Sequence, residues 1–271
     1  MNETVELLYC SNAGAYDGVM LSLLSVMRHT ARPLSVKILT ASFDCPGGEP
    51  VEKARASFMG ELLCRRGDGS ALVLEDVTEL ASALFTSEAA CGAFTPYTLL
   101  RLIADLVYSD EKVLYLDADT MAAGDIGRVY DLDLEDGLVG GVRDALGSVF
   151  LSPFYLNAGV LLLDIPGIAA DGAFTRARAF VRENKLRYPD QSALNYSDIP
   201  VTILPSFCNE QLHMRKDTVI RHFCRTVRFF PYPHVDRKKP WEKGGMRKND
   251  RRAFINSYEE FLLQRDGRKT V

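Results

Sequence analysis

The first half of this chain alternates apolar strand patterns with helical patterns, and this alternation restricts its fold more than any other feature. Strands are predicted at residues 5–10, 36–40, 71–74 and 113–116, and helices at residues 18–29, 51–66 and 98–107. Strands that alternate with helices form right-handed βαβ units and a mostly parallel sheet with helices on both faces. The sequence therefore predicts an α/β, Rossmann-like fold, in which ligands bind beyond the carboxyl ends of the strands.

The second half of the chain is less regular. We predict strands at residues 138–142, 160–163, 201–204 and 219–223, and helices at residues 174–183 and 253–264. No Gly/Ser-rich linker separates the two halves and no internal repeat is present, so we expect a single domain over residues 1–271.

Composition argues against several classes of protein. A chain of 271 residues with 47% hydrophobic content is able to bury a full core, which excludes global disorder. The formal net charge of −4 argues against a nucleic-acid partner, because affinity for the phosphate backbone needs a basic surface. The six cysteines form no C-x-x-C pair, so we expect reduced, mostly buried thiols rather than a zinc or redox site.

The start of the sequence indicates a location. Residues 1–6 are acidic and lack the basic flank and long apolar run of a secretory signal. The apolar stretch at residues 19–27 is too short to span a bilayer and is better explained as a buried helix. We therefore expect a cytoplasmic protein.

Residues 112–120 read Lys-Val-Leu-Tyr-Leu-Asp-Ala-Asp-Thr, an apolar strand that ends in paired carboxylates. Successive strand side chains point to opposite faces, so Asp117 and Asp119 project the same way if the extended conformation continues through Ala118. Carboxylates this close repel each other unless a cation lies between them. Oxygen ligands suit Mg²⁺ or Mn²⁺, so we predict a divalent metal that binds a diphosphate at this strand end.

The same string also fits other interpretations. Haloacid-dehalogenase-like phosphatases carry a strand followed by Asp-x-Asp-x-Thr, and Asp117 would then attack phosphorus. In those enzymes the motif usually follows the first strand of the domain, whereas a complete βαβαβ unit precedes it here. A helix cap or loop position is the simplest alternative for both aspartates.

Several motifs follow the aspartates in a fixed order. They are Asn157-Ala158-Gly159 before an apolar run to Asp164, Asp190-Gln191-Ser192-Ala193-Leu194-Asn195, Leu204-Pro205-Ser206-Phe207-Cys208-Asn209, His222-Phe223-Cys224 and Lys239-Pro240-Trp241. This order closely resembles glycosyltransferase family 8, the retaining GT-A enzymes that include bacterial lipopolysaccharide galactosyl- and glucosyltransferases and glycogenin. The resemblance extends over most of the chain, from Val5 to Trp241.

The resemblance implies a GT-A fold and a metal-dependent transfer of a hexose, glucose or galactose, from a UDP-sugar to a saccharide or lipid-linked acceptor. Asp117 and Asp119 would hold Mn²⁺, or Mg²⁺, with His222 as the third ligand. Independently, a neutral imidazole with two carboxylates suits Mn²⁺. A bond from His222 to a neighbouring carbonyl is the alternative.

The resemblance also assigns the residues around the transferred sugar. Asp190 and Gln191 match the catalytic pair that contacts the donor hexose and borders its anomeric carbon, although a helix N-cap is another role for Asp190. Asn157 and Gly159 match a sugar-binding turn, since an amide both donates to and accepts from hydroxyls and glycine permits close approach.

Other matches concern the remainder of the donor. Ala118 lies between the aspartates, and Arg101 corresponds to a donor-binding arginine one residue out of the expected register. Cys10, Asn12 and Tyr16 lie where the family binds uridine. Asn12 replaces the usual base-binding acid, and the stacking tyrosine falls one place late at Tyr16.

The end of the pattern departs from the family. Arg225 replaces a glycine after His222, and residues 226–238 are inserted before Lys239, the expected phosphate-binding lysine. Arg225, Arg228 and His234 are alternatives to Lys239 as the phosphate-binding residue. A second interpretation of the insertion is a lid that binds the acceptor.

By the same resemblance, residues 1–120 would form the nucleotide-binding half, 121–230 the donor-sugar and acceptor half, and 231–271 a basic C-terminal segment and helix. That segment contains Arg237, Lys238, Lys239, Lys243, Arg247, Lys248, Arg251 and Arg252. It is either a solvated loop, an anion-binding flap or a peripheral contact with the inner face of an acidic membrane. The resemblance indicates a bacterial enzyme of cell-envelope polysaccharide biosynthesis, and a non-catalytic sugar-nucleotide-binding protein is the remaining alternative.

Overall fold

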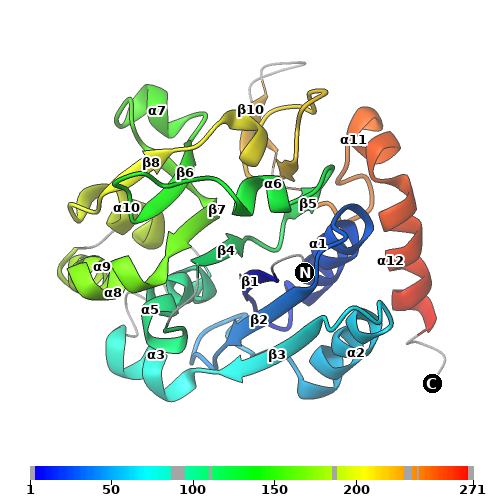
Figure 1. The fold of residues 1–271 in the computed structure, drawn as a ribbon, viewed down its shortest axis with the longest axis horizontal. Coiled ribbons are helices and arrows are strands. Elements are labelled where there is room, and N and C mark those ends of the chain that lie inside the picture. Colours follow the sequence, from blue (N-terminus) through cyan, green and yellow to red (C-terminus); the bar gives the residue numbers. More distant parts are fainter. Residues whose placement is uncertain are drawn as a thin grey trace.

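A seven-stranded sheet forms the centre of the computed structural model, which describes residues 4–86, 95–109, 112–184, 188–228, 234–236 and 238–267 (Figure 1). The strand order is β3-β2-β1-β4-β7-β6-β8. These strands are β1 Val5–Cys10, β2 Leu34–Thr40, β3 Ala71–Asp76, β4 Lys112–Leu116, β6 Val139–Arg143, β7 Leu156–Asp164 and β8 Val201–Ile203. β7 runs antiparallel to β4 and β6, and the other pairs of this sheet are parallel, which confirms the predicted mostly parallel α/β fold.

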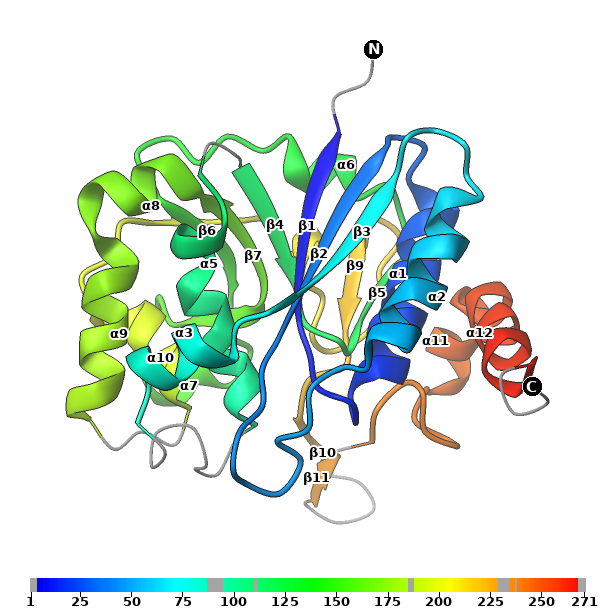
Figure 2. The same cartoon turned by 90° about the horizontal axis from the view of Figure 1, so that it is seen from below.

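Helices cover both faces of the sheet (Figure 2). One face carries α1 Tyr16–His29, α2 Lys53–Cys64, α11 Lys248–Ala253 and α12 Ile255–Gly267, and the other carries α3 Thr78–Leu84, η1 Pro96–Ile103, α5 Ala104–Val107, α8 Ile165–Asp171, α9 Ala173–Glu183 and α10 Pro189–Tyr196. In β1, Leu7 and Tyr9 pack into the first core layer, whereas Leu8 and Cys10 pack into the second. Burial on both faces explains why the central strands are mostly apolar.

The predicted helix over residues 98–107 is only partly correct. Residues Pro96–Ile103 form the 3₁₀ helix η1, and the α-helix α5 is limited to Ala104–Val107. A 3₁₀ helix is tighter than an α-helix and occurs mostly in short pieces, so a run of eight residues is unusual. Here it holds Arg101, which is 1% exposed, beneath the ends of β4 and β7.

The second half of the chain contains short elements that the sequence patterns do not reveal. They are β5 Thr120–Ala122, α6 Gly127–Tyr130, α7 Gly147–Phe150, η2 Ser206–Cys208, β10 Thr226–Arg228 and β11 His234–Asp236. The predicted strand at residues 219–223 is β9 Ile220–His222, which pairs with β5 rather than joining the central sheet. The predicted strand at residues 160–163 is longer, so Asn157, Ala158 and Gly159 belong to β7 and the predicted turn there is wrong.

In the insertion at residues 226–238, the described strands β10 and β11 pair antiparallel, and we call this strand pair the hairpin. Thr226 pairs with Asp236, so the two ends of the hairpin lie side by side. The chain therefore returns to the same place after the insertion. Arg237 lies outside the described residues.

No helix in the part of the chain that the structure describes is both long and apolar enough to cross a membrane.

Candidate functional site

A cavity of ≈ 880 Å³ lies beyond the carboxyl ends of β1, β4 and β6, where the sequence predicts ligand binding. The amino end of the antiparallel strand β7 reaches the same edge of the sheet, because Leu116 pairs with Val160 and the Asp117 N–H donates to the Gly159 carbonyl at 2.8 Å. All the predicted site residues line this cavity except Tyr16: Cys10, Asn12, Arg101, Asp117, Ala118, Asp119, Asn157, Gly159, Asp190, Gln191, His222 and Lys239.

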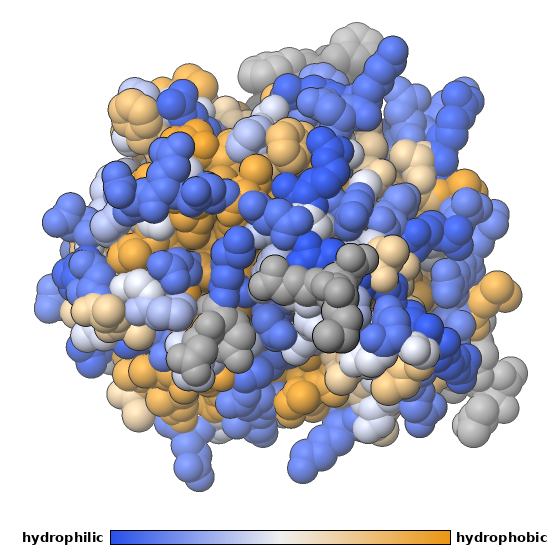
Figure 3. Space-filling model, viewed as in Figure 1, coloured by the Kyte–Doolittle hydropathy of each residue, from blue (hydrophilic) through white to orange (hydrophobic). Residues whose placement is uncertain are grey.

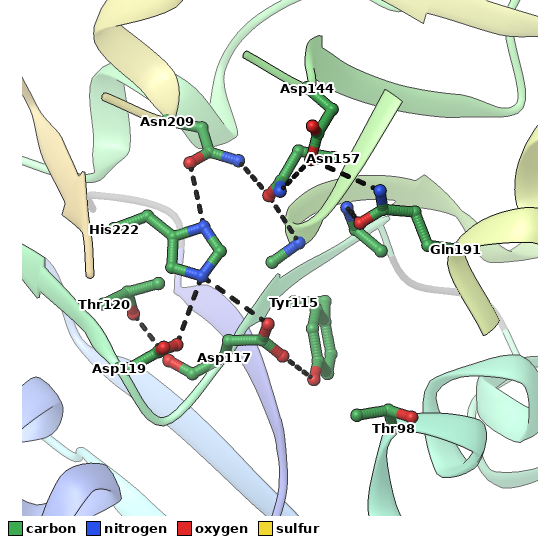
Figure 4. Close-up of polar contacts among 12 residues, drawn as sticks. Thr98, Tyr115, Asp117, Asp119, Thr120, Asp144, Asn157, Gln191, Asn209 and His222 are labelled. Carbon is green, nitrogen blue, oxygen red and sulfur yellow. Dashed lines mark hydrogen bonds and ion pairs between the residues drawn. The ribbon is translucent and has the colours of Figure 1, made fainter. Parts of the chain in front are cut away.

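The structure brings Asp117, Asp119 and His222 together on the cavity floor (Figure 4). His222 Nε2 lies 3.2 Å from Asp119 Oδ1 and 3.8 Å from Asp117 Oδ2, and the three potential ligand atoms are all within 4.8 Å of one another. The pairing of Thr120 with His222 in the β5–β9 ladder fixes this proximity. Two carboxylates and an imidazole are a donor set that fits Mn²⁺ or Mg²⁺.

The two aspartates converge for a different reason than the sequence suggests. β4 ends at Leu116, and the Thr120 N–H donates to the Asp117 carbonyl at 3.1 Å, so residues 117–120 form a turn. The expectation of an extended strand through Ala118 is therefore wrong. The turn nevertheless directs both carboxylates toward His222.

A chain of hydrogen bonds fixes the tautomer of His222. The Asp144 carboxylate only accepts, so Asn157 presents its Nδ2 to it at 2.8 Å and its Oδ1 to the other side. There Asn157 Oδ1 accepts from Asn209 Nδ2 at 2.9 Å, which turns Asn209 Oδ1 toward His222 Nδ1 at 3.2 Å. When the ring is neutral, its proton therefore lies on Nδ1, and Nε2, the nitrogen that faces the carboxylates, is the atom that would ligate a metal.

Asp117 is held by two donors. Its Oδ1 accepts from Arg101 Nη2 at 2.9 Å and from the Tyr115 hydroxyl at 2.6 Å. The Arg101 guanidinium also lies over the Tyr115 ring, 4.4 Å from its centroid, and donates to the Ala158 carbonyl. These contacts leave Asp117 Oδ2 directed toward His222.

Asp119 and Lys239 form an ion pair at the same site. Lys239 Nζ donates to Asp119 Oδ2, while Asp119 Oδ1 faces His222. Burial alone would raise the pKa of Asp119, but the attraction of Lys239 and His222 holds it well below its usual range. Asp119 is therefore ionised. Lys239 reaches the site because the inserted hairpin returns the chain to it.

The alternatives to Lys239 are only partly visible. Arg225 lines the cavity, whereas the side chains of Arg228 and His234 lie outside the described part of the molecule.

Asp190 and Gln191 lie in the first turn of α10, at the side of the cavity. Tyr188 occupies the N-cap of this helix, so the alternative N-cap role for Asp190 is wrong. Asp190 is 5% exposed and its Oδ2 lies 3.4 Å from Arg101 Nη2. Burial raises the pKa of Asp190, while Arg101 opposes that shift. Gln191 Oε1 accepts from the Ala158 N–H at 3.2 Å, and its Nε2 donates to Asp144 Oδ2 at 3.3 Å.

The loop after β1 differs from the uridine site that the sequence suggests. Asn12 Oδ1 accepts from the Ala15 N–H at 2.7 Å and its Nδ2 donates to the Gly47 carbonyl at 2.7 Å, so this amide holds the loop together. Cys10 lines the cavity, and burial raises the pKa of its thiol.

The structure argues against a stacking role for Tyr16. This residue starts α1 and is 0% exposed, because its ring packs inward against α2. Its hydroxyl donates to the Arg55 carbonyl at 2.7 Å. A side chain in this position contributes to the core and does not reach a ligand in the cavity.

Two glycines permit close approach of chain segments. A Cβ on Gly159 would lie 2.7 Å from both Nδ1 and Nε2 of His222, so only glycine leaves room for this ring. A Cβ on Gly18 would lie 2.7 Å from the Ala118 carbonyl oxygen and would also overlap the ring of Trp241. The first contact connects β7 with the candidate metal ligand, and the second connects α1 with the segment that carries Lys239.

Sequence reasoning missed Asp144, Asn209 and Tyr115. Asn209 belongs to the motif at residues 204–209, but the resemblance to the family assigns it no role. Asp144 follows β6 in an irregular segment, and its Oδ1 accepts from the N–H groups of Leu146 at 3.0 Å and Gly147 at 2.6 Å. No local pattern places such a residue in the site, since the side chains that donate to its Oδ2, Asn157 and Gln191, come from other elements.

Comparison with known proteins agrees with this geometry. Residues 88–242, more than half of the chain, match the model of glycosyl transferase family 8. Glycosyltransferase GlyA of Streptococcus pneumoniae is 26% identical over 164 residues, which cover 60% of this chain and 21% of that protein. The lipopolysaccharide 1,2-glucosyltransferase of Escherichia coli is 30% identical over 97 residues, which cover 31% of this chain and 29% of that enzyme. The chain thus spans between a fifth and a third of the length of these curated relatives.

Solved structures show the same fold. The galactosyltransferase LgtC, solved with donor and acceptor sugar analogs, superposes with a TM-score of 0.72 at 20% identity and covers 94% of this chain and 96% of that one. The glycosyltransferase GlyE of Streptococcus pneumoniae gives a TM-score of 0.68 at 17% identity, over 99% of this chain and 64% of that one. The fold is GT-A, and the phosphatase alternative for Asp117 is wrong. On the match of residues 88–242, the chain belongs to glycosyltransferase family 8.

Proposed function

We propose that this chain transfers a hexose, glucose or galactose, from UDP-hexose to a saccharide or lipid-linked acceptor, with retention of configuration and with Mn²⁺ or Mg²⁺. The observation that carries the proposal is the convergence of Asp117, Asp119 and His222 in the cavity that Asp190 and Gln191 also line. In this proposal residues 1–271 are one GT-A domain, in which residues 1–120 bind the nucleotide and residues 121–230 bind the donor sugar and acceptor.

The donor diphosphate would lie at the carboxyl end of β4. A divalent ion held by Asp117, Asp119 and His222 would neutralise the charge on the departing diphosphate. Lys239 places an ammonium group beside Asp119, in reach of the same negative charge. Arg101 is buried and bonds Asp117, Asp190 and the carbonyls of Thr98 and Ala158, so we assign it the orientation of these groups.

The hexose would lie between β7 and α10. Asn157 and Gln191 both bond the Asp144 carboxylate, which fixes their amides at the cavity wall. Asp190 is a buried carboxylate beside Arg101, suited to stabilise positive charge on the sugar ring as the glycosidic bond breaks.

Retention of configuration needs either a nucleophile beneath the anomeric carbon or attack on the face that the diphosphate leaves, and Gln191 is the residue expected to border that carbon. A carboxamide is a poor nucleophile, and both ends of this one are hydrogen-bonded to the protein. We therefore favour attack of the acceptor hydroxyl on the face of the sugar that the diphosphate leaves, guided by that leaving group. The proton of the acceptor hydroxyl would then pass to the departing phosphate oxygen.

A screen of UDP-sugars with Mn²⁺ tests the proposal. We expect slow hydrolysis of UDP-glucose or UDP-galactose without an acceptor, and faster UDP release when a saccharide acceptor is added. Absence of both reactions with every UDP-sugar would contradict it. UDP binding without any turnover would instead support the non-catalytic sugar-nucleotide-binding alternative.

The same proposal includes a peripheral contact with the inner face of an acidic membrane. Arg247, Lys248, Arg251 and Arg252 are exposed around α11, whereas Asp250 is buried against Arg221 at 3.4 Å. The basic side chains therefore point outward from an anchored helix. Co-sedimentation with anionic vesicles that persists after all four are changed to Gln would contradict this contact.

A further inference from the structure

One part of the cavity mouth is apolar, in contrast to the floor, whereas Thr95 and Arg225 are exposed elsewhere in the lining. We define the apolar mouth as the five exposed apolar side chains that line the cavity: Leu146, Phe150, Leu151, Leu212 and Val235. Their exposed fractions range from 37% for Leu146 to 77% for Phe150. Outside the cavity the surface continues over Val149 and Phe154, which are 72% and 63% exposed. Figure 3 shows apolar surface over the region where Figure 1 places α7.

The part of the mouth around α7 is built on a fixed backbone. Asp144 accepts from the Leu146 and Gly147 N–H groups, which anchors the start of α7 to the polar network of the floor. On the inner side, Gly147 packs so closely on Tyr155 that a Cβ would lie 3.1 Å from that ring's Cε1. Since the inner side of this turn is filled, Val149, Phe150 and Leu151 extend into solvent.

This arrangement constrains what an acceptor looks like. The reacting hydroxyl must reach the floor near Asp190 and Asp117, so the group attached to the acceptor sugar has to pass the mouth. A saccharide can stack the C–H face of its ring on one aromatic side chain, but its hydroxyls gain little from the exposed aliphatic side chains that make up most of this mouth. A hydrocarbon chain gains from covering them, because removal of apolar surface from water is favourable.

We infer that the apolar mouth binds the hydrocarbon part of an amphiphilic acceptor, so that the enzyme acts on a sugar attached to a lipid rather than on a free saccharide. The inference rests on the proposed function and narrows its acceptor to one class. The inference follows because the apolar wall of the cavity and the apolar surface outside it are continuous. Leu146, Phe150 and Leu151 belong to both.

Matched acceptors test this inference by turnover. Methyl and octyl β-glucosides and β-galactosides carry the same sugars and differ only in the hydrocarbon. Each fully buried methylene contributes roughly fourfold in affinity. Burial of part of the octyl chain therefore predicts a kcat/KM at least about tenfold higher for the octyl than for the methyl glycoside.

Variants separate the mouth from other exposed apolar residues. In the double variant Phe150→Ser, Leu151→Ser we expect the octyl-to-methyl ratio to fall close to one. The matched control is Leu263→Ser, which changes a 74% exposed leucine on α12, outside the cavity lining, and keeps the ratio. Equal ratios in the wild type and the double variant would overturn the inference, as would a wild-type ratio near one.

A binding measurement keeps the inference testable if turnover fails. Saturation-transfer NMR with octyl β-glucoside below its micelle concentration reports contact of the octyl protons with the protein, without any need for catalysis. We expect this signal in the wild type and in Leu263→Ser, and its loss in the double variant. Absence of transfer and of hydrolysis with every UDP-sugar, together with a retained, variant-sensitive signal, would defeat the proposed function and leave the mouth as a hydrocarbon site.

The same variants distinguish two other partners that could cover the apolar mouth, a second copy of this chain and a membrane. If sedimentation velocity shows a dimer that the double variant dissociates, the surface is an interface between two copies. If neutral phosphatidylcholine vesicles pellet the wild type but not the double variant, the surface contacts the membrane itself. Either result overturns the assignment to an acceptor.

Discussion

The floor and the mouth of the cavity are opposites. On the floor, the carboxylates, amides and His222 are mostly buried, and each is held by hydrogen bonds or ion pairs to neighbouring side chains. At the mouth, Phe150 and Leu151 are more than half exposed and contribute apolar surface. The floor is preorganised for a charged ligand before it arrives, whereas the mouth gains contacts only when a ligand covers it. Changes on the floor should therefore affect chemistry, and changes at the mouth should affect the choice of acceptor.

The largest expected effect comes from Asp119→Asn. This change removes a metal ligand and leaves Lys239 without its buried counter-charge. Metal and charge stabilisation of a leaving diphosphate supply several kcal/mol, so we expect kcat/KM for the UDP-sugar to fall roughly a thousandfold. Turnover with Mn²⁺ and Mn²⁺ binding by EPR measure the two losses.

A matched acid on the surface controls for loss of charge. Asp131 is exposed and bonds only Arg32 among the described contacts, so Asp131→Asn should retain full activity. Wild-type turnover in Asp119→Asn would mean that the carboxylate pair is structural and would remove the basis of the metal site.

The next effect is steric. In Gly159→Ala the new Cβ would overlap the His222 ring, which must rotate or move away from the aspartates. We expect a loss of roughly a hundredfold in kcat/KM, because a misplaced ligand weakens metal binding without removing either carboxylate. The control is Gly60→Ala in α2, where the nearest atom is the Leu72 Cβ at 3.9 Å. That substitution should leave activity unchanged, and an active Gly159→Ala enzyme would show that His222 is not required in its observed position.

A smaller effect is expected from Asn209→Ala. The change removes the acceptor for the His222 Nδ1–H and frees the ring to adopt either tautomer. Partners of this kind typically contribute about tenfold to a hundredfold in metal affinity. We therefore expect the Mn²⁺ concentration for half-activation to rise about tenfold, while kcat at saturating Mn²⁺ recovers most of its value.

That recovery is the diagnostic readout. A general destabilisation of the fold would lower kcat at every metal concentration and would lower the melting temperature as well. An unchanged Mn²⁺ dependence in Asn209→Ala would indicate that the chain from Asp144 to His222 does not orient the ligand.

These contrasts explain which parts of the site the sequence predicts. Asp117 and Asp119 follow an apolar strand directly, so the local pattern identifies them even though the turn that joins them differs from the expected extended strand. His222 is recognisable only through the order of motifs, since its approach depends on pairing of β5 with β9. Asp144 has no local signal, because its partners Asn157 and Gln191 come from β7 and α10.

The fold shows the same division. The βαβ units of the first half follow from strand and helix periodicity, which is set by neighbours in the chain. The short elements of the second half, such as α7 and β9, depend on tertiary contacts instead. The 3₁₀ helix η1 carries an apolar pattern that also fits an α-helix, and its tighter turn accompanies the buried contacts of Arg101.

The smallest expected effect on activity comes from changes of Tyr16, a residue that the resemblance places at the nucleotide and the structure places in the core. Sequence order placed this ring on the uridine, whereas the structure places it in the core with its hydroxyl on the Arg55 carbonyl. Tyr16→Phe should lower the free energy of unfolding by about 1 kcal/mol, the worth of one hydrogen bond, and leave the KM for the UDP-sugar within about twofold.

Tyr16→Leu removes the ring, and stacking of a base on an aromatic side chain is worth about 1–3 kcal/mol. A rise of tenfold or more in that KM, measured well below the melting temperature of the variant, would therefore place Tyr16 against the nucleotide, while a lower melting temperature with an unchanged KM assigns the ring to packing between α1 and α2.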